Sequence, residues 1–230
     1  MQRTLCRLAA VGVLMGVVDI HSALAQGNAR FEITITNLTR DQTFTPVFAT
    51  SHQPGLQMFD LGRPAHPALA TVAEEGDVAP IMALAQSSPL VLDVTFTGPP
   101  PGGFILPGQS RTLSLRTRGG FDYVSLAAML IPTNDGFFAL NGVAGPTGQG
   151  SVAHFSPAYD SGSERNDETC ASIPGPNFVE CGGPGGGGQP SGGEEGYVHI
   201  HAGIHGIGDF DASRRDWRNP VARIVIRRVP

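Results

Sequence analysis

The stretch Arg30-Phe31-Glu32-Ile33-Thr34-Ile35-Thr36-Asn37 alternates apolar and polar side chains without interruption. Successive side chains of an extended chain point to opposite faces, so Phe31, Ile33 and Ile35 share one face and the polar residues share the other. One face is then expected to be buried and the other to contact water. The stretch predicts a half-buried β-strand.

Further runs with strand character follow along the chain, each bounded by Gly, Pro or Asn. They cover Thr45–Thr50, Leu90–Thr97, Arg111–Thr117, Tyr123–Leu130, Tyr197–His201 and Val221–Val229. Helical character is confined to Pro67–Glu75 and Ala79–Gln86, which are rich in Ala, Leu, Met and Glu. Seven or more strands with one or two short helices in the connections predict an all-β fold, an antiparallel β-sandwich.

The first 25 residues have the order of a secretory signal sequence. A start with two arginines is followed by an apolar run from Leu8 to Val18 and by small residues before a cleavage point near Ala25 and Gln26. This run is too short for a ~30 Å hydrocarbon core, and no later stretch approaches about 18 apolar residues. We therefore expect a secreted or periplasmic protein whose mature chain, residues 26–230, is one domain without a transmembrane segment. The alternative is an uncleaved anchor.

Two cysteines, Cys170 and Cys181, remain once the signal sequence is removed. Disulfides persist in the compartments that exported proteins reach, so we expect these two to be bonded to each other, with two free thiols as the alternative. The adjacent segment 182–193 consists almost entirely of Gly, Pro and Ser. It has few side chains that could offset the entropy lost on ordering, and it is therefore predicted to be a mobile surface loop.

Three acidic residues have positions that suit a metal ion. Asp135 lies in a polar turn directly after an apolar strand, and Asp160 and Glu164 flank the turn Ser161-Gly162-Ser163. A glycine between two carboxylates lets the backbone turn so that both groups converge. Calcium binds several oxygen atoms at ~2.3–2.6 Å, and clustered loop carboxylates supply them. The alternative is that these side chains are solvated and bind nothing.

Several segments resemble the amino-terminal spondin domain of F-spondin, mindin and many exported bacterial proteins. The Pro-Ser-Pro-Asp-Trp turn of that family is similar to Pro132–Gly136 (Pro-Thr-Asn-Asp-Gly), and its Trp-Asp-Ala-Gly-Thr-Asp segment is similar to Tyr159–Glu164. Its closing strand, Val-Ala-Arg-Val-Val-Ile, resembles Val221–Ile226. Ser51-His52 and the spacing of small and acidic residues between Gly62 and Asp77 also fit. The resemblance covers most of residues 26–230.

The resemblance implies a fold, a cofactor and a role. Spondin domains are β-sandwiches related in shape to C2 domains, and the animal members bind calcium through acidic residues of two loops. It therefore implies Asp135, Asp160 and Glu164 as calcium ligands, and a function in adhesion or matrix association, not catalysis. Two departures bear on affinity: the family's tryptophan after the first aspartate is absent, and the third acid is Glu164 where the family has Asp.

Three histidines form a second candidate site, in the segment Tyr197–Gly206. If His199 and His201 lie on a strand, both rings project from one face, which is a spacing that β-proteins use for zinc or copper. His205 follows after a glycine-containing turn. The rival hypothesis is thus an extracytoplasmic metalloenzyme or metal-binding protein that uses these three rings. The alternative is that they are buried or solvated residues without a metal.

Charge and composition limit the classes of partner and of chemistry that the chain can have. A formal net charge of −5 argues against nucleic acid. No Gly-x-Ser-x-Gly motif indicates a serine nucleophile. The single tryptophan, Trp217, is expected to pack at the start of the closing strand, whereas an exposed Trp217 would indicate a binding surface. We expect the partner to be an extracellular protein or glycan, of unknown identity.

Overall fold

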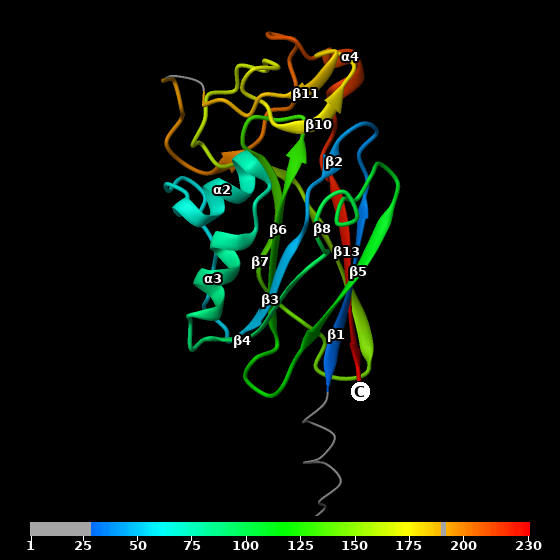
Figure 1. Cartoon of the computed structure of the whole chain (residues 1–230). Helices are drawn as coiled ribbons and strands as arrows, with labels where there is room; N and C mark the ends of the chain where they lie inside the picture. The colour runs from blue at the N-terminus through cyan, green and yellow to red at the C-terminus, as the bar shows by residue number, and fades with distance from the viewer. Residues whose placement is uncertain (1–28, 190–191) are drawn as a thin grey trace, which may run out of the picture.

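The structure is a computed structural model that describes residues 29–189 and 192–230 (Figure 1). The signal sequence predicted for residues 1–25 lies outside the described residues. Among the described helices, none has the length and apolar character needed to cross a membrane. The described chain is mostly β-structure, arranged as two large antiparallel sheets with short helices beside them, which confirms the predicted all-β sandwich.

The first sheet has the strand order β5–β1–β13–β8. Its members are β1 (Arg30–Asn37), β5 (Ser110–Arg116), β8 (Gly150–Ser156) and β13 (Ala222–Val229). All three pairings are antiparallel. Phe31, Ile33 and Ile35 of β1 are each 0% exposed, so the alternation read from the sequence does mark the buried face of this strand.

The second sheet has the order β12–β9–β7–β6–β3–β4, with β2 also paired to β6. Its strands are β2 (Thr43–Phe44), β3 (Phe48–His52), β4 (Val91–Phe96), β6 (Tyr123–Ile131), β7 (Gly136–Ala144), β9 (Ala158–Asp160) and β12 (His199–Ile200). β7 pairs with β9 so that Gly136 lies opposite Asp160. This register fixes where the acidic turns meet.

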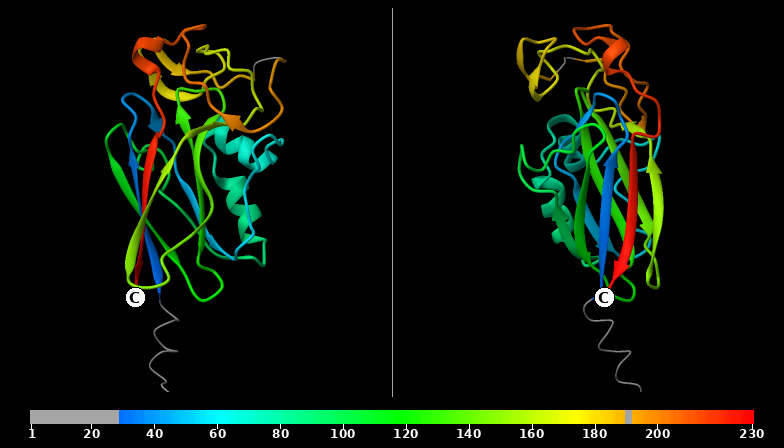
Figure 2. Two further views of the ribbon diagram at one scale, coloured as in Figure 1. Left: turned by 180° about the vertical axis from the view of Figure 1, so that it is seen from behind. Right: turned by 90° about the vertical axis from the view of Figure 1, so that its right-hand side faces the viewer.

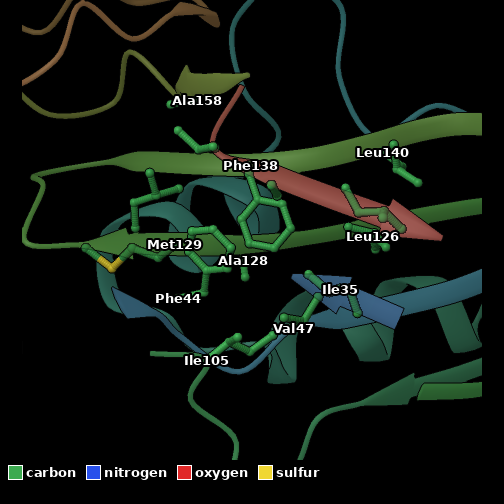
Figure 3. Close-up of a cluster of buried hydrophobic side chains, with 14 of the residues drawn as sticks. Ile35, Phe44, Val47, Ile105, Leu126, Ala128, Met129, Phe138, Leu140 and Ala158 are labelled. Carbon is green, nitrogen blue, oxygen red and sulfur yellow. The ribbon is translucent and has the colours of Figure 1, made fainter. Parts of the chain in front are cut away.

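The main core fills the space between the two sheets. Figure 3 shows apolar side chains from both sheets and from the segment before β5 converging there. Phe44 and Phe138 lie at its centre, with ring centroids 4.3 Å apart. Both are fully buried. Burial of two aromatic rings of this size is a large part of what stabilises the sandwich.

Two helices occupy the bounds predicted from the sequence, α2 (Pro67–Glu75) and α3 (Ala79–Gln86). Proline is tolerated in the first turn of each, and Gly76 ends α2 with a left-handed φ of 68°. The helices lie beside the second sheet (Figure 1) and bury Leu69 and Val72 against its outer face. Because this sheet is covered on both faces, its strands show little alternation in burial.

The connection between β9 and β13, residues 161–189 and 192–221, lies at one end of the sandwich (Figure 2). We call it the cap segment. It contains β12, the hairpin of β10 (Gly175–Phe178) and β11 (Gly183–Gly185), and a short helix, α4 (Ala212–Arg215), which the sequence did not predict. The C-terminus and the start of β1 lie together at the opposite end (Figure 2).

The predicted disulfide Cys170–Cys181 is present in the cap segment, with Cα atoms 5.6 Å apart. The predicted glycine-rich surface loop, 182–193, is partly ordered as strand β11, which differs from the expectation of a loop throughout. A Cβ on Gly185 would lie 1.9 Å from the Ile173 carbonyl oxygen, and one on Gly186 would lie 2.4 Å from that of Ala171. These glycines are needed for close backbone approach, which composition alone does not reveal.

A buried ion pair joins α4 to the β10–β11 hairpin. The Arg215 guanidinium donates from Nε to Glu180 Oε1 (2.8 Å) and from Nη2 to Oε2 (2.7 Å). It also donates to the Asp41 carbonyl oxygen of the sandwich (3.1 Å) and lies over the Phe178 ring. Trp217 is buried beside it in the chain, 8% exposed, which agrees with the expectation that it packs and does not form a binding surface.

Candidate metal centre

Asp135 lies in the turn between β6 and β7 and holds the neighbouring turn in place. Its Oδ2 accepts hydrogen bonds from the Ser161 hydroxyl (2.9 Å) and from the backbone N–H groups of Ser163 (2.8 Å) and Glu164 (3.1 Å). The other oxygen, Oδ1, is buried and has no hydrogen-bond partner. Oδ2 of this carboxylate therefore organises the loop, while Oδ1 is available to bind a further group.

Asp160, at the end of β9, is fully buried. Its Oδ1 accepts from the Gly162 N–H (2.8 Å) and its Oδ2 from the Asn166 amide (2.7 Å). Two imidazoles approach it as well: His199 Nε2 lies 3.5 Å from Oδ1, and His201 Nε2 lies 3.9 Å from Oδ2. The acidic and histidine sites, which were alternatives at the level of sequence, thus meet at this carboxylate.

Glu164 is 4% exposed, and its Oε2 has no hydrogen-bond partner. Burial, and then the charge of Glu74, raise its pKa to about 8. Burial, followed by the charge of Asp160, raises the pKa of Asp135 to about 6. Burial also raises the pKa of Asp160. The three predicted carboxylates are therefore all disfavoured as anions in the metal-free protein, which is the electrostatic condition that a bound cation relieves.

Among the described residues, one group of three side chains could hold a metal with the geometry as it stands. It consists of Asp160, Glu195 and His199, whose ligand atoms all lie within 4.8 Å of one another. Asp135 and Glu164 do not belong to this group, so binding of one ion by all three predicted carboxylates requires a side-chain rearrangement. Glu195 was missed because it lies in a Gly- and Glu-rich run without periodicity, and only folding brings it to β9.

The two histidines differ in the nitrogen that is free. His199 Nδ1 lies 3.0 Å from the Ile200 carbonyl oxygen, which can only accept, so a neutral ring carries its proton on Nδ1 and the lone pair on Nε2. In His201 the Gly203 N–H donates to Nδ1 (3.0 Å), so a neutral ring carries its proton on Nε2. Burial lowers the pKa of His201 to about 4 and keeps it neutral. Only His199 is thus prepared as a metal ligand through Nε2.

Gly162 makes the assembly of these groups possible. It has a left-handed φ of 66°, and a Cβ there would lie 2.2 Å from the carbonyl oxygen of Tyr197. The Gly196 N–H donates to its carbonyl oxygen (2.8 Å). The turn that carries Asp160 therefore contacts the segment that leads to His199 backbone against backbone.

His205, the third predicted histidine, does not join the centre. Its Nε2 lies 3.3 Å from the Ala202 carbonyl oxygen, and its backbone N–H donates to Glu168 Oε1 (2.6 Å). Glu168 Oε2 accepts from the N–H groups of Gly206 (2.7 Å) and Ile207 (3.0 Å). This buried carboxylate is saturated by backbone donors and has a structural role. No pattern in the sequence singled out Glu168.

The fold and the site together define a β-sandwich domain with a candidate metal centre at one end. No family model matches the chain, and no curated protein matches it. The resemblance to the spondin domain accordingly stays a prediction that rests on the motifs quoted above.

Proposed function

We propose that the chain is a secreted or periplasmic, calcium-binding domain of the spondin type, which acts as an adhesion or extracellular binding module and not as a catalyst. The observation that carries the proposal is the pair of buried carboxylate oxygens without partners, Asp135 Oδ1 and Glu164 Oε2, next to the buried Asp160. Buried carboxylates are normally paired or bound to a metal, because an isolated buried anion is costly.

Calcium suits this set better than magnesium. It accepts irregular arrangements of six to eight oxygens, whereas magnesium demands near-ideal octahedral geometry and loses water reluctantly. To join Asp135 and Asp160 at one ion, the buried Glu164 side chain would have to change its torsion angles. A bound ion would then connect the β6–β7 turn to the turn after β9, and so hold two loops at one end of the sandwich.

Two hydroxyl arrangements favour a binding role over nucleophilic catalysis. The Ser161 hydroxyl donates to Asp135, and Ser163 Oγ lies 2.5 Å from Ser161 Oγ, so both serines beside the centre have other partners. A serine–histidine contact does exist elsewhere, between Ser125 Oγ and His52 Nε2 (2.9 Å). Both residues are 0% exposed, so no substrate reaches this pair.

Thermal melts of the mature protein with chelator, calcium or magnesium test the calcium site. Saturating calcium, at about a hundred times the dissociation constant, should add roughly 2.7 kcal/mol to the free energy of unfolding. Asp135→Asn should remove most of this gain. Asp122→Asn, the same chemical change in the β5–β6 connection, should keep it. Equal melting temperatures in all three conditions, or a full calcium response in Asp135→Asn, would show that the site is wrong.

A further inference from the structure

Two acceptor atoms face each other beside the calcium site. In the neutral ring, His199 Nε2 bears the lone pair, because the Ile200 carbonyl oxygen can only accept and so holds the proton on Nδ1. It is buried, has no hydrogen-bond partner, and lies 3.5 Å from Asp160 Oδ1. In that neutral form, two lone pairs at this separation repel each other unless a positive charge lies between them.

The separation matches the edge of a coordination tetrahedron. Zinc binds imidazole nitrogen and carboxylate oxygen at ~2.0–2.2 Å, so the tetrahedral angle places two ligand atoms about 3.3–3.6 Å apart. The Glu195 carboxylate completes a set of three within 4.8 Å. Glu195 is exposed, so a fourth position on the solvent side is open to water.

We propose that Asp160, Glu195 and His199 form a binding site for a zinc-class transition-metal ion, separate from the calcium site and sharing Asp160 with it. An imidazole ligand favours such an ion, since calcium and magnesium prefer oxygen. The supporting contacts are in place. The Ile200 carbonyl oxygen orients His199, and the Gly162 N–H and the Asn166 amide orient Asp160.

His201 has a different role from the one expected from the spacing of the histidines. Its Nε2 lies 3.9 Å from Asp160 Oδ2, which is beyond hydrogen-bond distance, and its Nδ1 accepts a hydrogen bond from the Gly203 N–H. A metal at Nε2 would require the proton to move to Nδ1, where it would face another N–H. His201 is therefore not a ligand in this arrangement.

Titration of the mature, metal-stripped protein with zinc, followed by calorimetry, measures the stoichiometry and affinity. We expect one zinc ion per chain. His199→Ala and Glu195→Gln should each weaken zinc binding at least about tenfold, because substitution of residues that only orient a ligand commonly lowers metal affinity by that factor. The matched controls His205→Ala and Glu194→Gln should leave zinc affinity unchanged. Cobalt in place of zinc should give the absorption spectrum of a tetrahedral nitrogen- and oxygen-ligated ion, and His199→Ala should abolish it.

Calcium and zinc responses separate the two sites. His199→Ala should keep the calcium-dependent gain in melting temperature, and Asp135→Asn should keep zinc binding. The zinc site is overturned if less than one zinc binds per chain, or if His199→Ala binds zinc as tightly as His205→Ala. In that case His199 contacts Asp160 without a metal ion between them. Wild-type protein that binds zinc but shows no calcium-dependent gain in melting temperature would instead refute only the proposed calcium function.

Discussion

The sandwich body and the cap segment are stabilised by different kinds of contact. In the body, backbone groups pair along antiparallel strands, and apolar side chains such as Phe31 and Phe138 fill the space between the sheets. In the cap segment, whose strands are short, carboxylates also accept hydrogen bonds from backbone N–H groups. Glu168 accepts from three backbone N–H groups, and Asp209 accepts from the Cys170 N–H (2.8 Å).

This difference has a consequence for what each region requires. An apolar side chain in the body is satisfied by burial alone, whereas a buried carboxylate needs a donor or a cation for each oxygen. Glu168 has its donors, but Asp135 and Glu164 each keep one oxygen without a partner. The cap segment and the turn beside it are therefore the part of the molecule whose stability we expect to depend on a bound cation and on the disulfide.

The largest expected effect is in the body. Phe138→Ala removes a fully buried ring that packs on Phe44, and should lower the free energy of unfolding by about 3–5 kcal/mol. Phe155→Ala is the matched control, because Phe155 is 58% exposed on β8 and should change stability by less than about 0.5 kcal/mol. Urea denaturation measures both. Equal losses in the two variants would contradict the placement of the core.

Removal of the disulfide should have the next largest effect, confined to the cap segment. Cys170 and Cys181 are 11 residues apart, and the chain-entropy relation gives about 3 kcal/mol for a loop of this size. The double substitution to Ser should make residues 182–193 more sensitive to protease while the body keeps its far-ultraviolet spectrum. Wild-type protein treated with reductant loses the same bond without a substitution and serves as the comparison. Unchanged proteolysis in both would show that the bond does not stabilise the cap segment.

Glu168→Gln tests the carboxylate that organises the 205–207 turn. An amide keeps the shape, but its NH₂ group must face at least one of three backbone N–H donors, so we expect a loss of about 1–3 kcal/mol. Hydrogen exchange should become faster at His205, Gly206 and Ile207. Glu194→Gln, an exposed site, serves as the control. Unchanged exchange at the three amides would mean that Glu168 does not hold the turn.

The smallest effect is a pH dependence that should have opposite signs in the two regions. Burial raises the pKa of Glu164 to about 8 in the folded protein. The stability that protonated Glu164 contributes is therefore fully present at a pH below the pKa of the unfolded chain, and it is lost as pH rises toward 8. With chelator present, this loss should be on the order of 1 kcal/mol per pH unit, and calcium should cancel it. Burial lowers the pKa of His52 in the body, so its contribution is present above about 6.5 and is lost on acidification.

Stability curves measured with chelator between about pH 5 and about pH 8 separate the two contributions. Glu164→Gln should flatten the alkaline side, and His52→Gln should flatten the acidic side. A wild-type curve that rises steadily up to pH 8 in chelator would contradict the assignment for Glu164.

The body was largely predictable because its signals are local. The alternation in Arg30–Asn37 and the proline and glycine at the ends of α2 each act within a few residues. Strand β8 was not predicted, since Gly150–Ser156 carries one β-branched residue, and β7 was not predicted because its Gly136 and Asn141 read as turn residues.

The site was predictable only in part, for a related reason. Asp135, Asp160 and His199 lie in recognisable turns or strands, and the structure does bring Asp160 and His199 together. Glu195 and Glu168 depend on tertiary folding of irregular chain, for which no periodicity exists. The difference in tautomer between His199 and His201 depends on a single backbone contact of each ring, and the spacing of the histidines in the sequence does not contain that information.

Gly162 shows how close backbone packing limits the amino-acid substitutions that this protein can tolerate. Replacement of Gly162 by any other amino acid adds a Cβ, and that atom would clash with the Tyr197 backbone. Residue 162 also has a left-handed backbone conformation, which other amino acids rarely adopt. Gly148 and Gly150 have nothing within 4 Å of such an atom and no left-handed φ. In a library of all single substitutions, position 162 should therefore be almost invariant among folded, secreted variants, while 148 and 150 drift freely. The metal centre can thus be lost by variation at a residue that has no side chain to bind anything.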